Sequence, residues 1–323
     1  MWSMHPGTLY RAYRDHISDY YPDIDIDTGK WKPAEILQVD RDTGEIHETK
    51  PLYVFKPENF GSKMSIDDKQ IGRDGFTILS NTDTGKIAMM IESTGCSEVE
   101  QALDLFGADL QKVESISCDM SPTYLKACRN KFTQAQIVVD KFHVMQYVYD
   151  AVADVRLRIK KELSEKLSKG KQKTEQDREI LSDVERLRRS RHLLSQSPQK
   201  WSQTAEEMMW QLFEKHPQLK QAYDLAQQFK SWYDINNCLV DRIWIEKDLF
   251  LWYESAEKSK LGEFKSAVRM IEKHEQEIIN FFSHGHTNAK AERLNGKIQR
   301  FVSNNYGIKD KDFVLYRIAG YFS

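Results

Sequence analysis

The stretch MSIDDKQI, residues 64–71, opens the part of the chain that decides its fold. FTILS at 76–80 and IAMMI at 87–91 follow it, and a polar, glycine-containing turn separates these two runs. Short apolar or β-branched runs bounded by turn residues are typical of β-strands. The three runs therefore predict a meander of three consecutive strands.

Beyond the meander, helical and strand patterns alternate along the chain. A helix is expected from Ser97, as its N-cap with Glu100 at the third helical position, to about residue 106. A strand over 113–118 follows, then a helix over 122–132 that opens with a proline, and a short strand over 135–139. A meander followed by strands with helical crossovers predicts an α/β fold with a mixed sheet.

A long helical segment comes next. Amphipathic patterns at helical spacing predict helices over 144–167, 176–194, 203–213, 218–233 and 261–282. A segment of this length is too long to be a loop, so we interpret it as an inserted all-α domain. Its tryptophans are expected in the core, with Trp244 and Trp252 as the candidates for stacking on a nucleic-acid base.

The composition is that of a globular protein. The chain has 323 residues, of which 40% are hydrophobic and 30% charged, and its formal net charge is −2. Overall basicity therefore does not indicate nucleic-acid binding. Residues 156–200, however, contain fourteen Lys and Arg against seven Asp and Glu, a local basic excess that is compatible with DNA and also with a solvated helix surface.

The cysteines and the apolar runs exclude several classes of protein. The chain has four cysteines, Cys96, Cys118, Cys128 and Cys238. They form no C-x-x-C pair and do not have the spacing of a zinc finger. No signal peptide and no apolar run of about eighteen residues is present. In the first 60 residues we expect only a short helix over 8–17 and a hairpin whose strands, 36–39 and 45–47, flank RDTG at 41–44.

The stretch HGHTNAKAERLNGKIQR, residues 284–300, has three different faces when it is placed on a helix. The first is apolar, the second holds one carboxylate between two carboxamides, and the third is basic. The apolar face consists of Ala291, Leu294, Ile298 and Phe301. The face with the carboxylate consists of Asn288, Glu292 and Asn295, and the basic face consists of Arg293, Lys297 and Arg300. An ordinary amphipathic terminal helix is the simpler explanation of this pattern, and His284 and His286 are most simply loop residues.

Three acids in the sequence could meet in space. Asp67 lies in the middle of the first strand, Asp119 follows the fourth strand, and Glu292 lies on the late helix. If the two strands are neighbours, the three carboxylates repel one another unless cations lie between them. Oxygen ligands favour Mg²⁺ or Mn²⁺, and a pair of such ions serves phosphoryl transfer. The alternatives are that Asp68, on the opposite strand face, replaces Asp67, and that Asp119 only caps a helix.

Four motifs together resemble the ISL3 family of bacterial insertion-sequence transposases. They are SIDD at 65–68, CDMSPTY at 118–124, IVVDKFHV at 137–144, and NAKAERLNGKI at 288–298, which is followed by NYG at 305–307. The resemblance extends from about residue 62 to the end. It implies a ribonuclease H-like fold with a large all-α insertion before the last catalytic helix.

The resemblance also implies a mechanism and its residues. The catalytic and metal-binding triad would be Asp67, Asp119 and Glu292. Its cofactor would be Mg²⁺ or Mn²⁺, and the triad would bind two ions. Water would cut DNA at the end of the element, and the freed 3′-OH would attack target DNA without a covalent protein–DNA intermediate. The supporting residues around the metal would be Asp140, His143, Asn288 and Asn295, and the DNA contacts would be Lys141, Arg293, Lys297 and Arg300.

From these motifs we expect four parts: an N-terminal segment of unclear role (1–61), the first part of the catalytic core (62–143), the helical insertion (144–285) and the C-terminal part of the core (286–323). The expected partners are the terminal inverted repeats of the element, target DNA and a second copy in a synaptic homodimer. The family implies a protein of the bacterial cytoplasm and nucleoid, without membrane contact.

The N-terminus departs from the family pattern. Family members commonly carry a zinc-binding segment and a helix-turn-helix there, and residues 1–61 resemble neither. Recognition of the terminal repeats would then belong to a separate polypeptide, or the chain is an incomplete copy. Two other functions remain open from the sequence: a ribonuclease H-like nuclease that cuts without joining, and an inactive or domesticated DNA-binding derivative.

Overall fold

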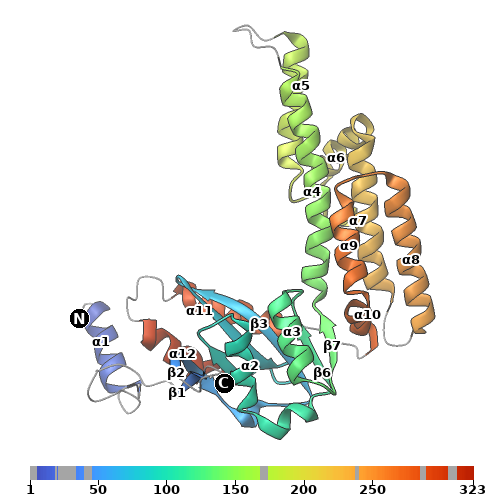
Figure 1. Ribbon diagram of the computed structural model, residues 1–323. Helices are drawn as coiled ribbons and strands as arrows, with labels where there is room; N and C mark the ends of the chain where they lie inside the picture. Colours follow the sequence, from blue (N-terminus) through green and yellow to red (C-terminus); the bar gives the residue numbers. More distant parts are fainter. Residues whose placement is uncertain are drawn as a thin grey trace. The chain divides into compact units, whose positions relative to one another are not determined.

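The computed structural model describes residues 6–18, 20, 34–39, 46–167, 174–236, 240–283, 289–304 and 311–323. The chain divides into two compact units. Unit 1 comprises Met1–Val138 and Thr287–Ser323 and holds the sheet, and unit 2 comprises Val139–His286 and is helical (Figure 1). Among the described helices, none has the length and apolar character needed to cross a membrane.

Within the described residues, seven strands form one mixed sheet in the order β1-β2-β5-β4-β3-β6-β7. Pairing is antiparallel between β1 and β2, β2 and β5, β5 and β4, and β4 and β3, whereas β3 and β6 are parallel. The predicted meander and mixed sheet are therefore confirmed. The strands are β1 (Ala34–Val39), β2 (Ile46–Phe55), β3 (Lys63–Ile71), β4 (Asp74–Asn81), β5 (Ile87–Ile91), β6 (Ser115–Cys118) and β7 (Gln136–Val139).

A tight turn fixes which side chains of β3 point to which face of the sheet. Ile71 pairs with Asp74, so only two residues connect β3 to β4, and the first of them, Gly72, has a φ of 67°. Glycine adopts this positive φ without steric cost, which suits a two-residue hairpin. The resulting register places Asp67 opposite Ile78, and the following residue pair points to the other face.

Helices α11 (Ala289–Asn304) and α12 (Lys311–Phe322) cover the face of the sheet that carries Ile78. Apolar periodicity on α11 explains this contact, because Leu294 and Ile298 are both buried against the sheet. The buried cluster unites four strands, β2, β3, β4 and β5, with both helices, and it consists of Tyr53, Val54, Ile71, Phe76, Ile78, Ile87, Met90, Leu294, Ile298, Val314, Leu315 and Ile318.

Helices α2 (Cys96–Asp104) and α3 (Pro122–Lys131) contact the sheet at β5 and β6 and also pack on each other. The predicted N-cap of α2 was wrong, because the helix begins at Cys96 after Gly95. Glu100 is not part of a capping box. Its carboxylate is buried and accepts a hydrogen bond from Asn130 of α3 at 2.6 Å, so tertiary contact decides its role.

The described N-terminal residues belong to unit 1. The predicted hairpin is confirmed by β1 and β2, which extend the sheet beyond β5. The predicted helix is α1 (Pro6–His16), which packs on α12 through aromatic rings. Tyr10 meets the edge of Phe313 with ring centroids 5.8 Å apart, and Tyr316 donates a hydrogen bond to the Ser18 carbonyl at 3.0 Å.

Unit 2 is built from helices with an aromatic core. Trp232 and Trp252 are both buried, and each indole N–H donates to a backbone carbonyl. The helix predicted over 261–282 is two helices, α9 and α10, which meet at His274. The helices are α4 (Lys141–Glu165), α5 (Glu175–Arg189), α6 (Gln203–Lys215), α7 (Pro217–Ile235), α8 (Arg242–Ser259), α9 (Phe264–Lys273) and α10 (Glu275–Ser283).

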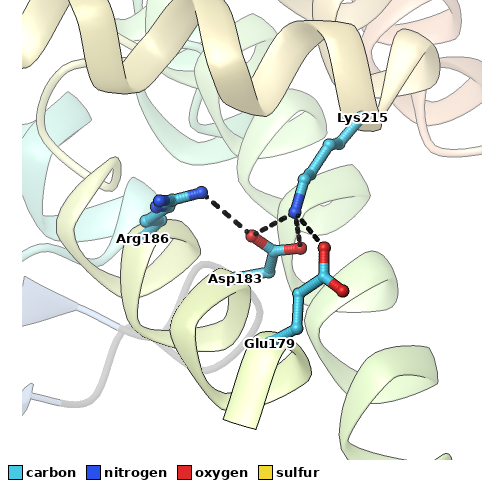
Figure 2. Close-up of polar contacts among 4 residues, drawn as sticks. All are labelled: Glu179, Asp183, Arg186 and Lys215. Carbon is cyan, nitrogen blue, oxygen red and sulfur yellow. Dashed lines mark hydrogen bonds and ion pairs between the residues drawn. The ribbon is translucent and has the colours of Figure 1, made fainter. Parts of the chain in front are cut away.

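A charged cluster connects α5 to α6 within unit 2 (Figure 2). The carboxylate of Asp183, whose side chain is 9% exposed, accepts hydrogen bonds from Lys215 at 3.0 and 3.3 Å and from Arg186 at 3.3 Å. Glu179 also accepts from Lys215 at 2.8 Å. A buried carboxylate needs such partners, so this cluster fixes the packing of the two helices.

Candidate active site

Asp67 lies on β3, and Asp119 directly follows β6, the parallel neighbour of β3. In the register of β3 and β6, Lys63 lies opposite Ser115 and Ser65 opposite Ser117. Continuing this register by two residues sets Asp67 level with Asp119, which lies one residue past the end of β6, and adjacent strands are spaced about 4.8 Å apart. Both acids are half-buried. The sheet therefore brings together two of the three acids that the sequence singled out.

Two hydrogen bonds orient the carboxylate of Asp67. Its Oδ1 accepts from the backbone N–H of Asp68 at 2.9 Å, and its Oδ2 accepts from Nδ2 of Asn295 at 2.5 Å. Asn295 lies on α11, which contacts β3 in addition to the apolar cluster. The late helix is therefore seated directly over the predicted catalytic strand.

Glu292 lies on α11 one turn before Asn295. Residues three apart on a helix share a face, so the backbone of Glu292 is on the face that reaches Asp67. The side chain of Glu292 is outside the described residues. Among the side chains that the structure describes, no group of three His, Cys, Asp or Glu residues gathers as a metal site, and the complete triad stays a prediction.

Asp119 is not the N-cap of α3, which was the simpler alternative. The N-cap is Ser121, and its side chain makes no capping hydrogen bond. Instead, Oδ1 of Asp119 accepts from the backbone N–H of Ser121 at 2.9 Å. This contact fixes the turn between β6 and α3 and holds the carboxylate at the end of its strand.

Tyr124 of α3 contacts Thr77 on the sheet face opposite α11, and the sequence assigned it no role. Its hydroxyl is 2.9 Å from Oγ1 of Thr77, which itself donates to the Ser93 carbonyl at 2.6 Å, so Tyr124 is the donor to Thr77. Burial raises the pKa of Tyr124, and the carboxylates of Asp68, Asp119 and Asp67 raise it further. The available clue was its place in the CDMSPTY motif.

Asp68, the alternative to Asp67 as the catalytic acid, lies on the other face of the sheet. Three neighbouring acids affect the hydroxyl of Tyr124, so they lie within electrostatic range of one atom. Asp68 is exposed and pairs with Thr77, on the face opposite Ile78. Asp67 is the acid that faces α11, and this orientation favours it over Asp68 as the partner of Glu292.

The basic face of α11 is present as the pattern predicted. Arg293, Lys297 and Arg300 are all exposed, whereas Leu294 and Ile298 are buried. The cations therefore lie on the same helix as Asn295 and Glu292 and are turned to solvent. Their contact with DNA stays a prediction.

Three further predicted residues, Asp140, Lys141 and His143, belong to unit 2. Asp140 caps α4 by accepting from the backbone N–H of Phe142 at 2.8 Å. Lys141 pairs with Asp234 at 2.9 Å and lies over the ring of Tyr233 at 5.0 Å. Their roles in catalysis or DNA binding stay predictions. Asn288, His284 and His286 are outside the described residues.

Several of the cations in residues 156–200 are engaged in ion pairs. Arg158 pairs with Glu263 at 2.6 Å and with Glu162 at 3.1 Å, and both Arg188 and Arg189 pair with Glu185. Of the two candidates for base stacking, Trp252 is 1% exposed and belongs to the core. Trp244, at 56% exposed, is on the surface.

The donor atoms of the site suit a divalent cation. Asp67 and Asp119 are half-buried neighbours, and like charges at such spacing raise each other's energy unless a cation is shared. Carboxylate oxygens are the ligands that Mg²⁺ and Mn²⁺ prefer, and Mg²⁺ commonly uses one or two of them together with substrate phosphates. The described acids therefore fit the metal implied by the sequence motifs.

Comparison with known proteins agrees with this geometry. The family model of the ISL3-type DDE proteins, described as a transposase, matches residues 64–318. The match includes both acid-bearing strands, the helical unit and α11. A comparison with curated proteins and one with solved structures gave no match. The mixed sheet with its helices is consistent with the ribonuclease H-like fold of such transposases. Because the model matches most of the 323 residues, the chain belongs to the ISL3 family of transposases.

Proposed function

We propose that this protein cuts and joins DNA strands with Asp67, Asp119 and Glu292 as its metal-binding acids. The observation that supports this most is the parallel register of β3 and β6, which sets Asp67 beside Asp119. The hydrogen bond from Asn295 to Asp67 adds the third segment, because Asn295 and Glu292 share one face of α11.

In this proposal the protein's own residues position the reacting groups. Asp67, Asp119 and Glu292 would hold two Mg²⁺ ions, which supply charge stabilisation at the attacking and leaving oxygens when bound. Asn295 and the Asp68 N–H fix the two oxygens of Asp67, and the Ser121 N–H fixes one oxygen of Asp119. Such supporting hydrogen bonds keep carboxylates oriented for their ligand.

The DNA backbone would lie along α11. Arg293, Lys297 and Arg300 are exposed on the helix that also carries Glu292 and Asn295, so they are positioned to contact phosphates next to the scissile bond. Lys141 would contact a phosphate only after leaving its ion pair with Asp234. The proposed substrates are the terminal inverted repeats of the element and target DNA.

The proposed reaction has two phosphoryl transfers. In the first, water attacks the phosphorus at the end of the element, the bond to the 3′ oxygen breaks, and a 3′-OH and a 5′-phosphate result. In the second, this 3′-OH attacks a target phosphorus and releases a target 3′-OH. No protein side chain forms a bond to DNA in either step.

The test replaces Asp119 with Asn, which keeps the shape of the side chain and removes its charge. We expect Mg²⁺-dependent cleavage of an element end to fall at least about 100-fold, while salt-dependent DNA binding persists. Asp109→Asn is the control, because Asp109 is a carboxylate in a surface ion pair with Lys112 on the same unit. Equal cleavage by Asp119→Asn and the control would remove the proposed site.

A pre-cut element end separates transposase from nuclease. With a 3′-OH already present, the protein should join it to target DNA in the presence of Mg²⁺. Cleavage of intact DNA without any joining of the pre-cut end would favour the nuclease, and binding without either reaction would favour an inactive derivative.

A further inference from the structure

Helix α8 exposes large apolar side chains on the side facing away from the core of unit 2. Ile243 is 70% exposed, Trp244 56%, Phe250 59% and Leu251 45%. Single exposed apolar residues are ordinary on protein surfaces. Four of them on one helix, two of them aromatic, are characteristic of a surface that another molecule covers.

The four side chains form one continuous stripe. At 3.6 residues per turn they fall, together with Lys247 and Glu254, within an arc of about 120°. The buried residues of α8 lie on the opposite side of the helix, and they are Ile245, Leu249, Trp252 and Ala256. We call the six residues Ile243, Trp244, Lys247, Phe250, Leu251 and Glu254 the outer stripe.

The charge of α8 favours a protein partner over DNA. Its three cations, Arg242, Lys247 and Lys258, are outnumbered by four carboxylates, which are Glu246, Asp248, Glu254 and Glu257. A surface that binds the phosphate backbone carries a net positive charge. The outer stripe lacks this charge, and its apolar residues suit the buried centre of a protein interface.

The order of residues along the outer stripe makes it complementary to itself. From the N-terminal end it consists of an apolar pair, Lys247, a second apolar pair and Glu254. If two copies of α8 are antiparallel about a two-fold axis between Phe250 and Leu251, the numbering places Lys247 of each copy opposite Glu254 of the other. Phe250 then lies opposite Leu251 of the second copy. A closed two-fold interface requires this kind of complementarity.

We propose that two copies of this chain associate through the outer stripe of α8, antiparallel about an axis between Phe250 and Leu251. Association exchanges weak surface contacts for buried ones. Glu254 now pairs with Lys258 at 3.0 Å, and Lys247 lies 4.8 Å from the ring centroid of Trp244. Solvent-exposed contacts of this kind are weak, so they do not oppose the exchange.

The first experiment measures the mass of the full chain in solution by sedimentation equilibrium at about 10 µM, a concentration at which micromolar dimers are populated. We expect a dimer for the unchanged protein and a monomer for the double variant Trp244→Glu/Phe250→Glu. Leu181→Glu, on α5, is the matched control, since Leu181 is an exposed apolar residue outside the stripe. Circular dichroism verifies that each variant is folded.

The second experiment tests the register. Lys247→Glu and Glu254→Lys should each weaken the dimer at least tenfold, because each sets like charges opposite each other. The double variant should recover the dimer, since the pairing is only reversed. A monomeric unchanged protein, or a double variant that stays as weak as the single ones, would overturn the proposal.

Two further arms keep this inference separate from catalysis. Asp119→Asn should remain a dimer, so loss of cleavage and loss of association have different causes. If Trp244→Glu/Phe250→Glu weakens DNA binding while the mass is unchanged, the stripe is a DNA contact and the proposed dimer is wrong.

Discussion

The side-chain amide of Asn295 donates a hydrogen bond to Asp67 at 2.5 Å across 228 positions of sequence. This contact joins the late helix to the acid-bearing strand inside one unit. We expect Asn295→Ala to lower cleavage by about 10–100-fold and to raise the Mg²⁺ concentration needed for half-maximal rate, because the carboxylate loses its orientation. Gln299→Ala, on the exposed side of α11, is the control.

A purely structural role for Asn295 would give a different result. In that case Asn295→Ala would lower the unfolding free energy and leave the Mg²⁺ dependence of the remaining activity unchanged. A Mg²⁺ titration of the cleavage rate, together with urea unfolding, distinguishes the two roles.

The seating of α11 depends on Ile298, which is completely buried between the sheet and α12. Replacing it with Ala removes several buried methyl and methylene groups and leaves a cavity, so we expect a loss of about 2–5 kcal/mol in unfolding free energy. Arg300→Ala on the solvent face should change it by less than about 0.5 kcal/mol. Urea unfolding followed by circular dichroism measures both, and equal values for the two variants would contradict this packing.

Asp183 needs its cationic partners because it is buried. Lys215→Met should destabilise unit 2 by about 1–3 kcal/mol, since the carboxylate loses a charged hydrogen-bond donor. Adding Asp183→Asn to Lys215→Met should recover part of this loss, because the buried charge disappears as well. Lys220→Met, which breaks an exposed pair with Asp224, is the control and should cost at most about 1 kcal/mol. Additive effects of the two substitutions would show that the pair is not coupled.

His216, between α6 and α7, gives unit 2 a pH dependence. Burial lowers its pKa, and the nearby Lys215 lowers it as well, although Asp183 acts in the opposite direction. In the unfolded chain a histidine takes up its proton near pH 6.5. Below that pH the unfolded state therefore binds more protons than the folded state, and stability falls as the pH decreases towards the folded pKa.

We expect the melting temperature of His216→Gln to decrease less between pH 7 and pH 5.5 than that of the unchanged protein. His192→Gln, at an exposed position of the same unit, should leave the pH dependence as it was. The same dependence in all three proteins would mean that His216 titrates alike in both states.

The sheet could be predicted from sequence because its strands have strong local patterns. IAMMI is apolar throughout and is β5 without change, and CDMSPTY marks the end of β6 and the start of α3. The prediction that Asp67 and Asp119 lie close together required the assumption that β3 and β6 pair. No local pattern specifies a partner 52 positions away.

Other features depend on tertiary contacts that a local pattern does not show. Helix α8 was not predicted, because it is apolar on both sides and so has little helical periodicity. Tyr124 had no predicted role, since its contact with Thr77 arises from α3 packing on the sheet. The pairing of Arg188 and Arg189 with Glu185 likewise is not specified by the apolar pattern of α5.

The division of unit 1 into two chain segments has a consequence for synthesis of the protein. While the ribosome makes unit 2, the residues of β3 and β4 have already been translated. Helices α11 and α12, which cover Phe76 and Ile78, have not yet been made. An apolar sheet face left uncovered during translation is prone to aggregation or to capture by chaperones. Under the proposed triad, the nascent chain holds Asp67 and Asp119 long before it holds Glu292, so a partly made molecule would not yet be able to cut DNA.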